Sequence, residues 1–378
     1  MNLVLENASV VLPDRVIEHG SVVVESGVIA AVADTSPSVP GAKIIDLTGA
    51  MLLPGFIDVH IHGAVGIDVM DATAADLRKL SEYLVSQGVT GWLPTLVPGS
   101  DENYASVAAA VSEAKHSADV KGARILGLHY EGPFVNSAQC GALHVEYFKT
   151  YSSPADLHSL RADEDMARMI TLAPEIAGGV ELVRELTRRG WVVSIGHTRA
   201  TLEIMDQALA AGARHMTHFM NAMSPLHHRS PGPIAWGLAH DDVTCDMIAD
   251  GIHLDRFMLQ LLVKIKGARA ITLISDAIAA AGKGDGDYHI WDETISVKNG
   301  RTSNASGSIA GSVITMLDAV RVMRSVGLSY VDIAQMASTN PARLLGLDHE
   351  CGSIETGKRA DLVALDASGN VRMALCSS

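Results

Sequence analysis

The stretch GFIDVHIHG at residues 55–63 is an almost continuous apolar run that ends in two histidines. Such runs are typical of strands buried on both faces of a parallel sheet. Amphipathic stretches with apolar residues at three- and four-residue steps follow at residues 72–87, 102–115, 179–189 and 201–212. Seven further apolar runs lie at residues 88–96, 123–132, 167–175, 190–198, 213–221, 243–251 and 268–277. Eight buried strands that alternate with helices predict an α/β fold, the (β/α)8 TIM barrel.

The two ends of the chain share a different pattern. Residues 1–52 contain short β-branched runs between Gly, Asn and Pro breaks, and residues 347–378 return to it. We therefore predict a small β-sandwich domain assembled from residues 1–52 plus 347–378, beside a barrel domain at residues 53–346. A doubly wound open sheet is the structural alternative, but no GxGxxG motif follows a strand.

Composition excludes several functions. The 378 residues are 48% hydrophobic, which excludes global disorder. A formal net charge of −14 repels polyanions, so we predict neither nucleic acid nor membrane as a partner. Sixteen histidines point instead to metal or proton chemistry.

Cysteine spacing and hydropathy bear on the compartment. The four cysteines are scattered without a CxxC pair, which argues against a zinc ribbon and a disulfide scaffold. The start of the sequence lacks the pattern of a secretory signal, and no run of about 20 apolar residues occurs. We predict a cytoplasmic protein.

The first predicted strand ends in His60 and His62. Residues i and i+2 of a strand point to the same side, so both imidazoles can converge on one ion. Two structural histidines are the alternative interpretation. Asp58 shares their face, and we predict that it orients one of the imidazoles.

Three further strand ends carry candidate metal ligands. Glu131 ends the third strand, His197 the fifth and His218 the sixth. Imidazole and carboxylate are common ligands of borderline divalent metals. His129 and His215 compete for the same role, but each lies deeper in its strand.

Asp276 ends the eighth strand, in the segment LISDA. One interpretation is an N-cap for the next helix. The other is the proton carrier of a metal-assisted hydrolysis, which needs a carboxylate beside the reacting water.

These motifs carry a resemblance. The chain resembles the amidohydrolase superfamily and, within it, the N-acetylglucosamine-6-phosphate deacetylase family. The resemblance runs nearly end to end, through LPGFIDVHIHG, GLHYEGPFVN, SIGHT, THFMNAM, ADGIHLD, SDAIAAAG, SIAGS, STNPARLLGL and GSIETGKRADLVALD. The EGPF, GHT and THxxNAM blocks are specific to the family, whereas PGFIDxHxH and the ADLVxxD tail mark the wider superfamily.

The resemblance implies roles for individual residues. The family's metal ligands fall on Glu131, His197 and His218, and its catalytic acid/base falls on Asp276. The intact pair His60 and His62 adds a potential second metal site, since some family members carry Gln-x-Asn there and use one ion. The implied cofactor is Zn²⁺, as one ion or two. The implied sugar and phosphate contacts are Ala142, Leu143, Asn221, Ala222, Arg229, His253, Ile309, Ala310 and Gly311.

Arg229 and His253 also point to a phosphate from their chemistry alone, because a guanidinium fork and an imidazole suit a phosphomonoester. A solvated loop residue is the alternative for Arg229. The family's dimeric assembly, in which one subunit helps to complete its neighbour's phosphate site, implies a homodimer.

The sequence departs from the family pattern in two further places. After EGPF it reads Gln139-Cys140-Gly141-Ala142-Leu143, with His144 one position late for the group that polarises the acetyl carbonyl. Ile278 and Ala280 replace common Thr and Pro residues, which leaves the sugar epimer and the acyl group open.

We predict a metal-dependent deacetylase that hydrolyses an N-acetylhexosamine 6-phosphate, with the glucosamine derivative as first choice. The first rival is another amidohydrolase, acting on a different N-acyl amino sugar or a cyclic amide, or deaminating an aryl substrate. Cyclic-amide enzymes of the superfamily usually carry a carboxylated Lys on the fourth strand, and residues 172–175 contain none. The second rival is an inactive barrel that serves as a binding protein.

Overall fold

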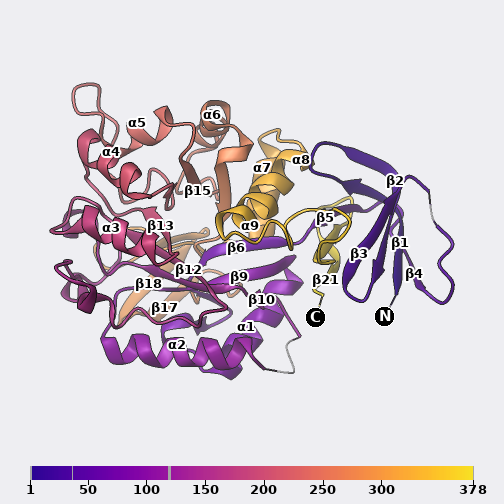
Figure 1. Cartoon of the computed structure of the whole chain (residues 1–378), viewed down its shortest axis with the longest axis horizontal. Helices are drawn as coiled ribbons and strands as arrows, with labels where there is room; N and C mark the ends of the chain where they lie inside the picture. Colours follow the sequence, from indigo (N-terminus) through magenta and orange to yellow (C-terminus); the bar gives the residue numbers. More distant parts are fainter. Residues whose placement is uncertain (1, 36, 118–120, 378) are drawn as a thin grey trace.

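The computed structural model describes residues 2–35, 37–117 and 121–377 and places eight parallel strands in a nearly closed barrel (Figure 1). The barrel strands are β6 (Phe56–Ile61), β9 (Val89–Leu96), β11 (Gly127–Glu131), β12 (Ala167–Leu172), β13 (Val192–Ile195), β14 (His215–Met216), β15 (Thr244–Ile248) and β16 (Ile271–Ile274). A short strand, β10 (Arg124–Ile125), pairs with β9 ahead of β11. Each barrel strand falls inside a predicted run, so the barrel prediction is confirmed.

Backbone hydrogen bonds join the first and last strand ends. Asp276 N–H donates to His60 O at 2.9 Å, and His62 N–H donates to Ala277 O at 2.8 Å. The strand predicted at residues 213–221 is shorter than expected, because β14 has only two residues and the backbone turns at His218 with φ 29°.

Helices cover the outside of the barrel (Figure 1). They are α1 (Ala74–Ser86), α2 (Asp101–Lys115), α3 (Gly179–Arg188), α4 (Leu202–Ala211), α5 (Gly232–Ala239), α6 (Arg256–Lys266), α7 (Met316–Ser325), α8 (Tyr330–Ala334) and α9 (Asn340–Leu344). The four predicted helical stretches are α1 to α4. Thr73 and Asp76 form a capping box that fixes the start of α1, an arrangement worth about 1 kcal/mol.

Strands from both chain ends come together in one mixed sheet, where the sequence analysis predicted a β-sandwich assembled from the same two ends. Its members are β1 (Leu3–Val11), β2 (Val16–Glu25), β3 (Val28–Ala33), β4 (Lys43–Asp46), β5 (Met51–Pro54), β20 (Leu362–Leu365) and β21 (Val371–Leu375). The order is β21-β20-β5-β1-β2-β3, and β4 pairs with β1. The sheet has its own apolar core, in which Leu5, Val22, Ile29 and Leu52 are fully buried.

Two small β structures follow barrel strands. β7 (Gly63–Ala64) and β8 (Ile67–Asp68) form a hairpin after β6. β17 (Gly286–Ile290), β18 (Glu293–Lys298) and β19 (Arg301–Ser303) form a three-stranded sheet after β16, which the sequence analysis did not predict.

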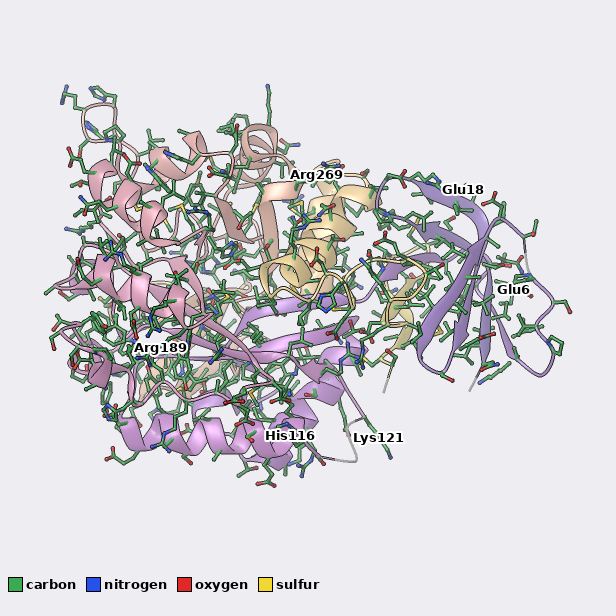
Figure 2. All side chains as sticks on the ribbon, viewed as in Figure 1. Glu6, Glu18, His116, Lys121, Arg189 and Arg269 are labelled. Atoms are coloured by element: carbon green, nitrogen blue, oxygen red, sulfur yellow. The ribbon has the colours of Figure 1, made fainter. Side chains whose placement is uncertain are left out.

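Charged side chains lie on the outside of the molecule. Glu18 on the mixed sheet and His116, Lys121, Arg189 and Arg269 on the barrel domain are exposed (Figure 2). Among the described residues, no helix is long and apolar enough to cross a membrane.

Candidate active site

The structure brings Glu131, His197 and His218 together at the carboxyl ends of β11, β13 and β14. Glu131 Oε1 lies 2.9 Å from the Nε2 atoms of both histidines, and those two nitrogens are 3.2 Å apart. All three residues are buried. One carboxylate oxygen and two imidazole nitrogens therefore converge on one point.

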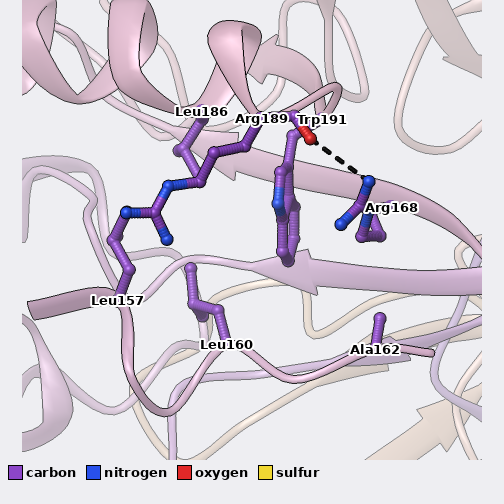
Figure 3. Close-up of a pocket in the computed structure, with 7 residues that line it drawn as sticks. All are labelled: Leu157, Leu160, Ala162, Arg168, Leu186, Arg189 and Trp191. Carbon is purple, nitrogen blue, oxygen red and sulfur yellow. Dashed lines mark hydrogen bonds between the residues drawn. The ribbon is translucent and has the colours of Figure 1, made fainter. Parts of the chain in front are cut away.

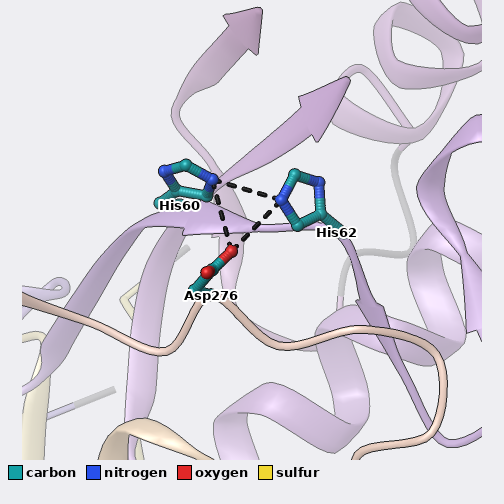
Figure 4. Close-up of side chains that lie close together, drawn as sticks. All are labelled: His60, His62 and Asp276. Atoms are coloured by element: carbon teal, nitrogen blue, oxygen red, sulfur yellow. Dashed lines mark hydrogen bonds and ion pairs between the residues drawn. The ribbon is translucent and has the colours of Figure 1, made fainter. Parts of the chain in front are cut away.

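His60, His62 and Asp276 form a second group (Figure 4). The Nε2 atoms of His60 and His62 are 3.1 Å apart, and they lie 3.4 Å and 3.2 Å from Asp276 Oδ1. Glu131 joins the two groups, because its Oε2 lies 3.3 Å from His62 Nε2 while its Oε1 faces His197 and His218.

The backbone turns sharply where three of these side chains leave their strands. His197, His218 and Asp276 have φ values of 48°, 29° and 51°, in a region that residues other than glycine seldom adopt. Such strain persists where the surrounding structure holds it, and it gathers at functional sites. Here the positive φ values occur at the turns where these three side chains converge at the barrel mouth.

Hydrogen bonds orient two of the imidazoles. His197 Nδ1 donates to Gln139 O at 2.7 Å, and His62 Nδ1 donates to Thr95 O at 3.2 Å. With Nδ1 as the donor, the neutral form of each ring presents the Nε2 lone pair to the group, which is the tautomer that a metal ligand needs. The buried Nδ1 atoms of His60 and His218 have no hydrogen-bond partner among the described residues.

The two competing histidines have both ring nitrogens engaged. His129 contacts Val59 O at 2.9 Å and Thr171 Oγ1 at 2.8 Å. His215 contacts Thr244 Oγ1 at 2.6 Å and Asp246 Oδ1 at 2.7 Å. Neither ring has a nitrogen left over for a metal ion.

Asp58 does not orient an imidazole, contrary to our expectation. Its carboxylate accepts hydrogen bonds from the backbone N–H groups of His60 and Ser275 and from Ser275 Oγ. Asp58 therefore ties β6 to the end of β16, and its burial raises its pKa to about 6.

Interactions among the carboxylates and imidazoles of the site shift the pKa values of these side chains. Burial alone would raise the pKa of Glu131, yet the charge of His60 and the contacts with the rings of His197 and His218 hold it well below its usual value. Burial likewise opposes ionisation of Asp276, but His60 and His62 lower its pKa. For His62, burial acts downward, and contacts with Asp276 and Glu131 overcome it and raise the pKa to about 10. Both carboxylates are therefore anionic at neutral pH.

Two loops that contain predicted substrate residues lie next to this site. The loop that contains Ala142 and Leu143 approaches His197, since a Cβ on Gly141 would lie 3.5 Å from His197 Cε1. Gly311 has φ 57°, and a Cβ there would lie 2.9 Å from Asp276 O, so the segment with Ile309 and Ala310 contacts the end of β16.

The segment after β14 is tied to the His197 turn. Thr198 N–H donates to Ala222 O at 3.1 Å, and Asn221 Nδ2 donates to His218 O at 3.2 Å. Asn221 and Ala222, the two predicted sugar contacts of this segment, therefore come shortly after the candidate ligand His218 in the sequence. Their hydrogen bonds join them to the turns at His197 and His218.

Arg229 and His253 differ in their surroundings. Arg229 is exposed in the loop before α5, and its side chain has no partner within residues 2–35, 37–117 and 121–377. The side chain of His253 is buried, and its Nδ1 lies 2.6 Å from Asp250 Oδ2. His144 Nδ1 contacts Glu146 Oε1 at 3.1 Å.

Sequence reasoning missed two residues that hold site loops in place. Glu175 accepts hydrogen bonds from Asn136 Nδ2, Thr198 Oγ1 and Arg199 N–H, at 2.8, 2.6 and 2.6 Å. Asp250 accepts from the backbone N–H of His253 as well as facing its ring. Their positions after β12 and β15 were the available signal, because functional residues of barrels lie at strand ends.

A separate pocket lies away from this site (Figure 3). Arg168 near the start of β12 and Trp191 just before β13 place it toward the amino ends of these strands. Arg168 donates to Arg189 O at 3.2 Å and lies 6.0 Å from the centre of the Trp191 ring. The full lining is Leu157, Leu160, Ala162, Arg168, Leu186, Arg189 and Trp191.

The donor set of the site fits a divalent cation. Carboxylate oxygens and oriented Nε2 atoms are the ligands of catalytic zinc sites, which keep one position open for substrate. Anionic Glu131 and Asp276 supply the negative charge that a buried cation needs. The clusters are consistent with divalent metal sites.

A barrel with this site at its mouth belongs to the class of metal-dependent hydrolases, and residues 51–377 match the model of the amidohydrolase family. The chain is 37% identical to N-acetylglucosamine-6-phosphate deacetylase of Bacillus subtilis (strain 168), over 99% of this chain and 96% of that protein. It is 35% identical to N-acetylgalactosamine-6-phosphate deacetylase of Escherichia coli O157:H7, over 92% and 91%. The crystal structure of N-acetylglucosamine-6-phosphate deacetylase from Pasteurella multocida superposes with a TM-score of 0.92 at 29% identity, covering 100% of this chain and 99% of that one. The chain therefore belongs to the N-acetylglucosamine-6-phosphate deacetylase family within the amidohydrolases.

Proposed function

We propose that this protein hydrolyses the acetamide of an N-acetylhexosamine 6-phosphate, with N-acetyl-D-glucosamine 6-phosphate as the substrate. The products are acetate and the amino sugar 6-phosphate. The observation that carries the proposal is the buried carboxylate Glu131 shared between two histidine groups, with anionic Asp276 beside them. The relatives named above support the substrate class.

Glu131, His197 and His218 are the proposed ligands of the principal cation, with His60 and His62 as ligands of a second. We propose Zn²⁺, because a carboxylate with two imidazoles is a common catalytic zinc set. When bound, such an ion polarises a carbonyl and lowers the pKa of water from about 16 toward 7.

Asp276 is the proposed acid/base. Its carboxylate is anionic, and its Oδ1 faces the point where the two histidine groups meet. Asp276 accepts a proton from the attacking water as the new C–O bond forms. It then returns that proton to the sugar nitrogen as the C–N bond breaks, because an amine anion is a poor leaving group.

The proposed substrate contacts are those that the sequence assigned. His253 and Arg229 are the proposed phosphate contacts, and Asp250 supports His253 by facing its Nδ1. The exposed position of Arg229 supports a homodimer in which this side chain serves the neighbouring subunit. The four free cysteines support a reducing, cytoplasmic compartment.

The deciding experiment measures acetate and ammonia release from N-acetylated glucosamine, galactosamine and mannosamine, each with and without a 6-phosphate. We expect acetate from the phosphorylated gluco compound above all others and no ammonia. Ammonia release would assign the protein to the deaminases. A preference for the galacto compound would retain the reaction and change the substrate.

A further inference from the structure

Trp291 occupies the tip of the hairpin between β17 and β18. It forms a two-residue turn with Asp292, with φ values of 54° and 57°. Positive φ at both positions defines a type I′ turn, which Asn and Gly fill most readily. A bulky indole in this backbone region is uncommon, and outliers of this kind gather at functional sites.

The indole of Trp291 lies against a site histidine. Its ring centroid is 5.4 Å from that of His62, and the two planes stand at 89°, an edge-to-face contact. His62 Nε2 is itself 3.2 Å from Asp276 Oδ1. One imidazole thus separates Trp291 from the proposed proton carrier.

Apolar packing holds the indole in this position. Trp291 packs against a cluster that includes Ile278, Ala280 and Ala310, and Ala142 packs against the same cluster. Ala310 and Ala142 are two of the proposed substrate contacts. The indole therefore belongs to the wall on which those contacts lie.

Asp68 at the end of β8 faces the indole N–H. Burial raises the pKa of Asp68 to about 6, while the N–H of Met70, the charge of His62 and the indole N–H act in the opposite direction. In the described part of the chain, neither Asp68 Oδ2 nor Trp291 Nε1 reaches hydrogen-bond geometry with any group. The indole thus contacts His62 and lies near Asp68 without being fixed by a hydrogen bond.

The order of the barrel strands gives the direction in which the substrate extends. Asn221 follows β14, and His253 follows β15, so the sugar phosphate extends over that part of the barrel. Asp276 follows β16, and Trp291 contacts His62 at the end of β6, on the other side of Asp276. With the amide carbon at Asp276 and the sugar over β14 and β15, the acyl chain is directed toward Trp291.

We infer that Trp291 is a specificity-determining residue that limits the acyl group to acetyl by closing the side of the site next to His62. This inference rests on the proposed deacetylase function and extends it to the acyl group. A longer acyl chain meets the indole, whereas a methyl group fits in front of it.

The test compares kcat/KM for the N-acetyl, N-propanoyl and N-butanoyl forms of glucosamine 6-phosphate. In Trp291→Ala we expect the propanoyl-to-acetyl ratio to rise about 10-fold or more, since one methylene at an apolar wall changes specificity by about 10- to 200-fold. Trp291→Leu retains part of the volume and should give an intermediate ratio. It also provides a readout if the alanine variant does not fold.

Ile295→Ala is the matched control, because Ile295 is buried in the same hairpin and its loss loosens the hairpin without removing the indole. We expect this variant to keep the wild-type ratio within about twofold. An unchanged ratio in folded Trp291→Ala or Trp291→Leu overturns the inference while leaving the deacetylase function intact. The same rise in Ile295→Ala also overturns it. A wild-type protein that releases no carboxylate from any of the three compounds overturns the proposed function itself.

Discussion

Glu175 Oε2 accepts a hydrogen bond of 2.6 Å from Thr198 Oγ1, which joins the loop after β12 to the turn that carries His197. The other carboxylate oxygen accepts from Arg199 N–H and Asn136 Nδ2, and Asn136 N–H donates to His197 O at 3.1 Å. Glu175 thus holds the two residues that follow His197 in the sequence, while remaining outside the group of candidate ligands. A side chain so placed orients the imidazole through the backbone.

Replacing Glu175 with alanine should weaken metal binding. Loss of a residue that orients a ligand typically costs 10- to 100-fold in metal affinity or activity, and we expect a loss in that range. A competition titration with a chelator measures the affinity directly. Glu181→Ala, an exposed acidic residue on α3, is the matched control and should bind metal as the wild type does. Equal affinities in the two variants would show that Glu175 has no part in positioning His197.

Asp276→Asn should separate catalysis from metal binding. The amide keeps the shape of the side chain but cannot accept the proton, so we expect kcat to fall at least about 100-fold, the low end for general acid–base catalysis. Elemental analysis of the purified variant should still find at least about one metal ion per chain, because Glu131, His197 and His218 are retained. Near-normal turnover with intact metal would remove Asp276 from the proposed mechanism.

The barrel could be predicted because its strands are buried on both faces, as Phe56, Ile57 and Val59 of β6 are, and therefore read as apolar runs. The sheet β17–β19 was not found, because one of its faces is exposed and its sequence is polar. A signal was present nonetheless. Asn299-Gly300 joins β18 to β19 with positive φ at both residues, and Asn-Gly between alternating apolar residues indicates a hairpin.

The convergence of Glu131, His197 and His218 could be anticipated, since carboxyl ends of parallel strands meet at one edge. The partners of individual side chains could not. The position of Glu175 after a strand marks it as a candidate but does not show that it holds a loop, and nothing in the sequence shows that Asp58 contacts Ser275 rather than an imidazole. Such pairings depend on long-range packing.

Arg229→Ala should affect the phosphorylated substrate alone. Losing a charge-assisted hydrogen bond costs about 1.5–3 kcal/mol, so KM for the 6-phosphate should rise about 10- to 150-fold. The weak activity on the unphosphorylated sugar should stay nearly constant. His228→Ala, in the same exposed loop, serves as the control and should leave both KM values unchanged. Equal losses on both substrates would mean that Arg229 is structural.

Metal affinity at the histidine pair should increase with pH. A proton and a cation compete for the same lone pair on His62, and Asp276 and Glu131 raise the pKa of His62 to about 10 despite its burial. A raised pKa favours the protonated ring, so a proton still competes with the metal ion for His62 at neutral pH. We expect the apparent affinity to increase about 10-fold per pH unit between pH 6 and 8, for one proton released. Titrations of Zn²⁺ at fixed ionic strength measure this slope, and a flat profile would contradict it.

The double variant His60→Gln/His62→Asn addresses the number of metal ions. Glu131 Oε1 lies 2.9 Å from the Nε2 atoms of both His197 and His218. The pair His60 and His62 only shares Glu131 with that group, so we expect the pair to bind a metal ion more weakly. We therefore expect one to two metal ions per chain in the native protein, with the ion at the histidine pair lost first on dialysis.

In the double variant, elemental analysis should find about one ion per chain. Activity should remain measurable, because Glu131, His197, His218 and Asp276 are all retained. His129→Gln is an instructive control, since both nitrogens of this neighbouring ring are engaged with Val59 and Thr171 and its loss removes no candidate ligand. A double variant without any metal would show that the principal site is the histidine pair, which would invert the proposed assignment of ligands.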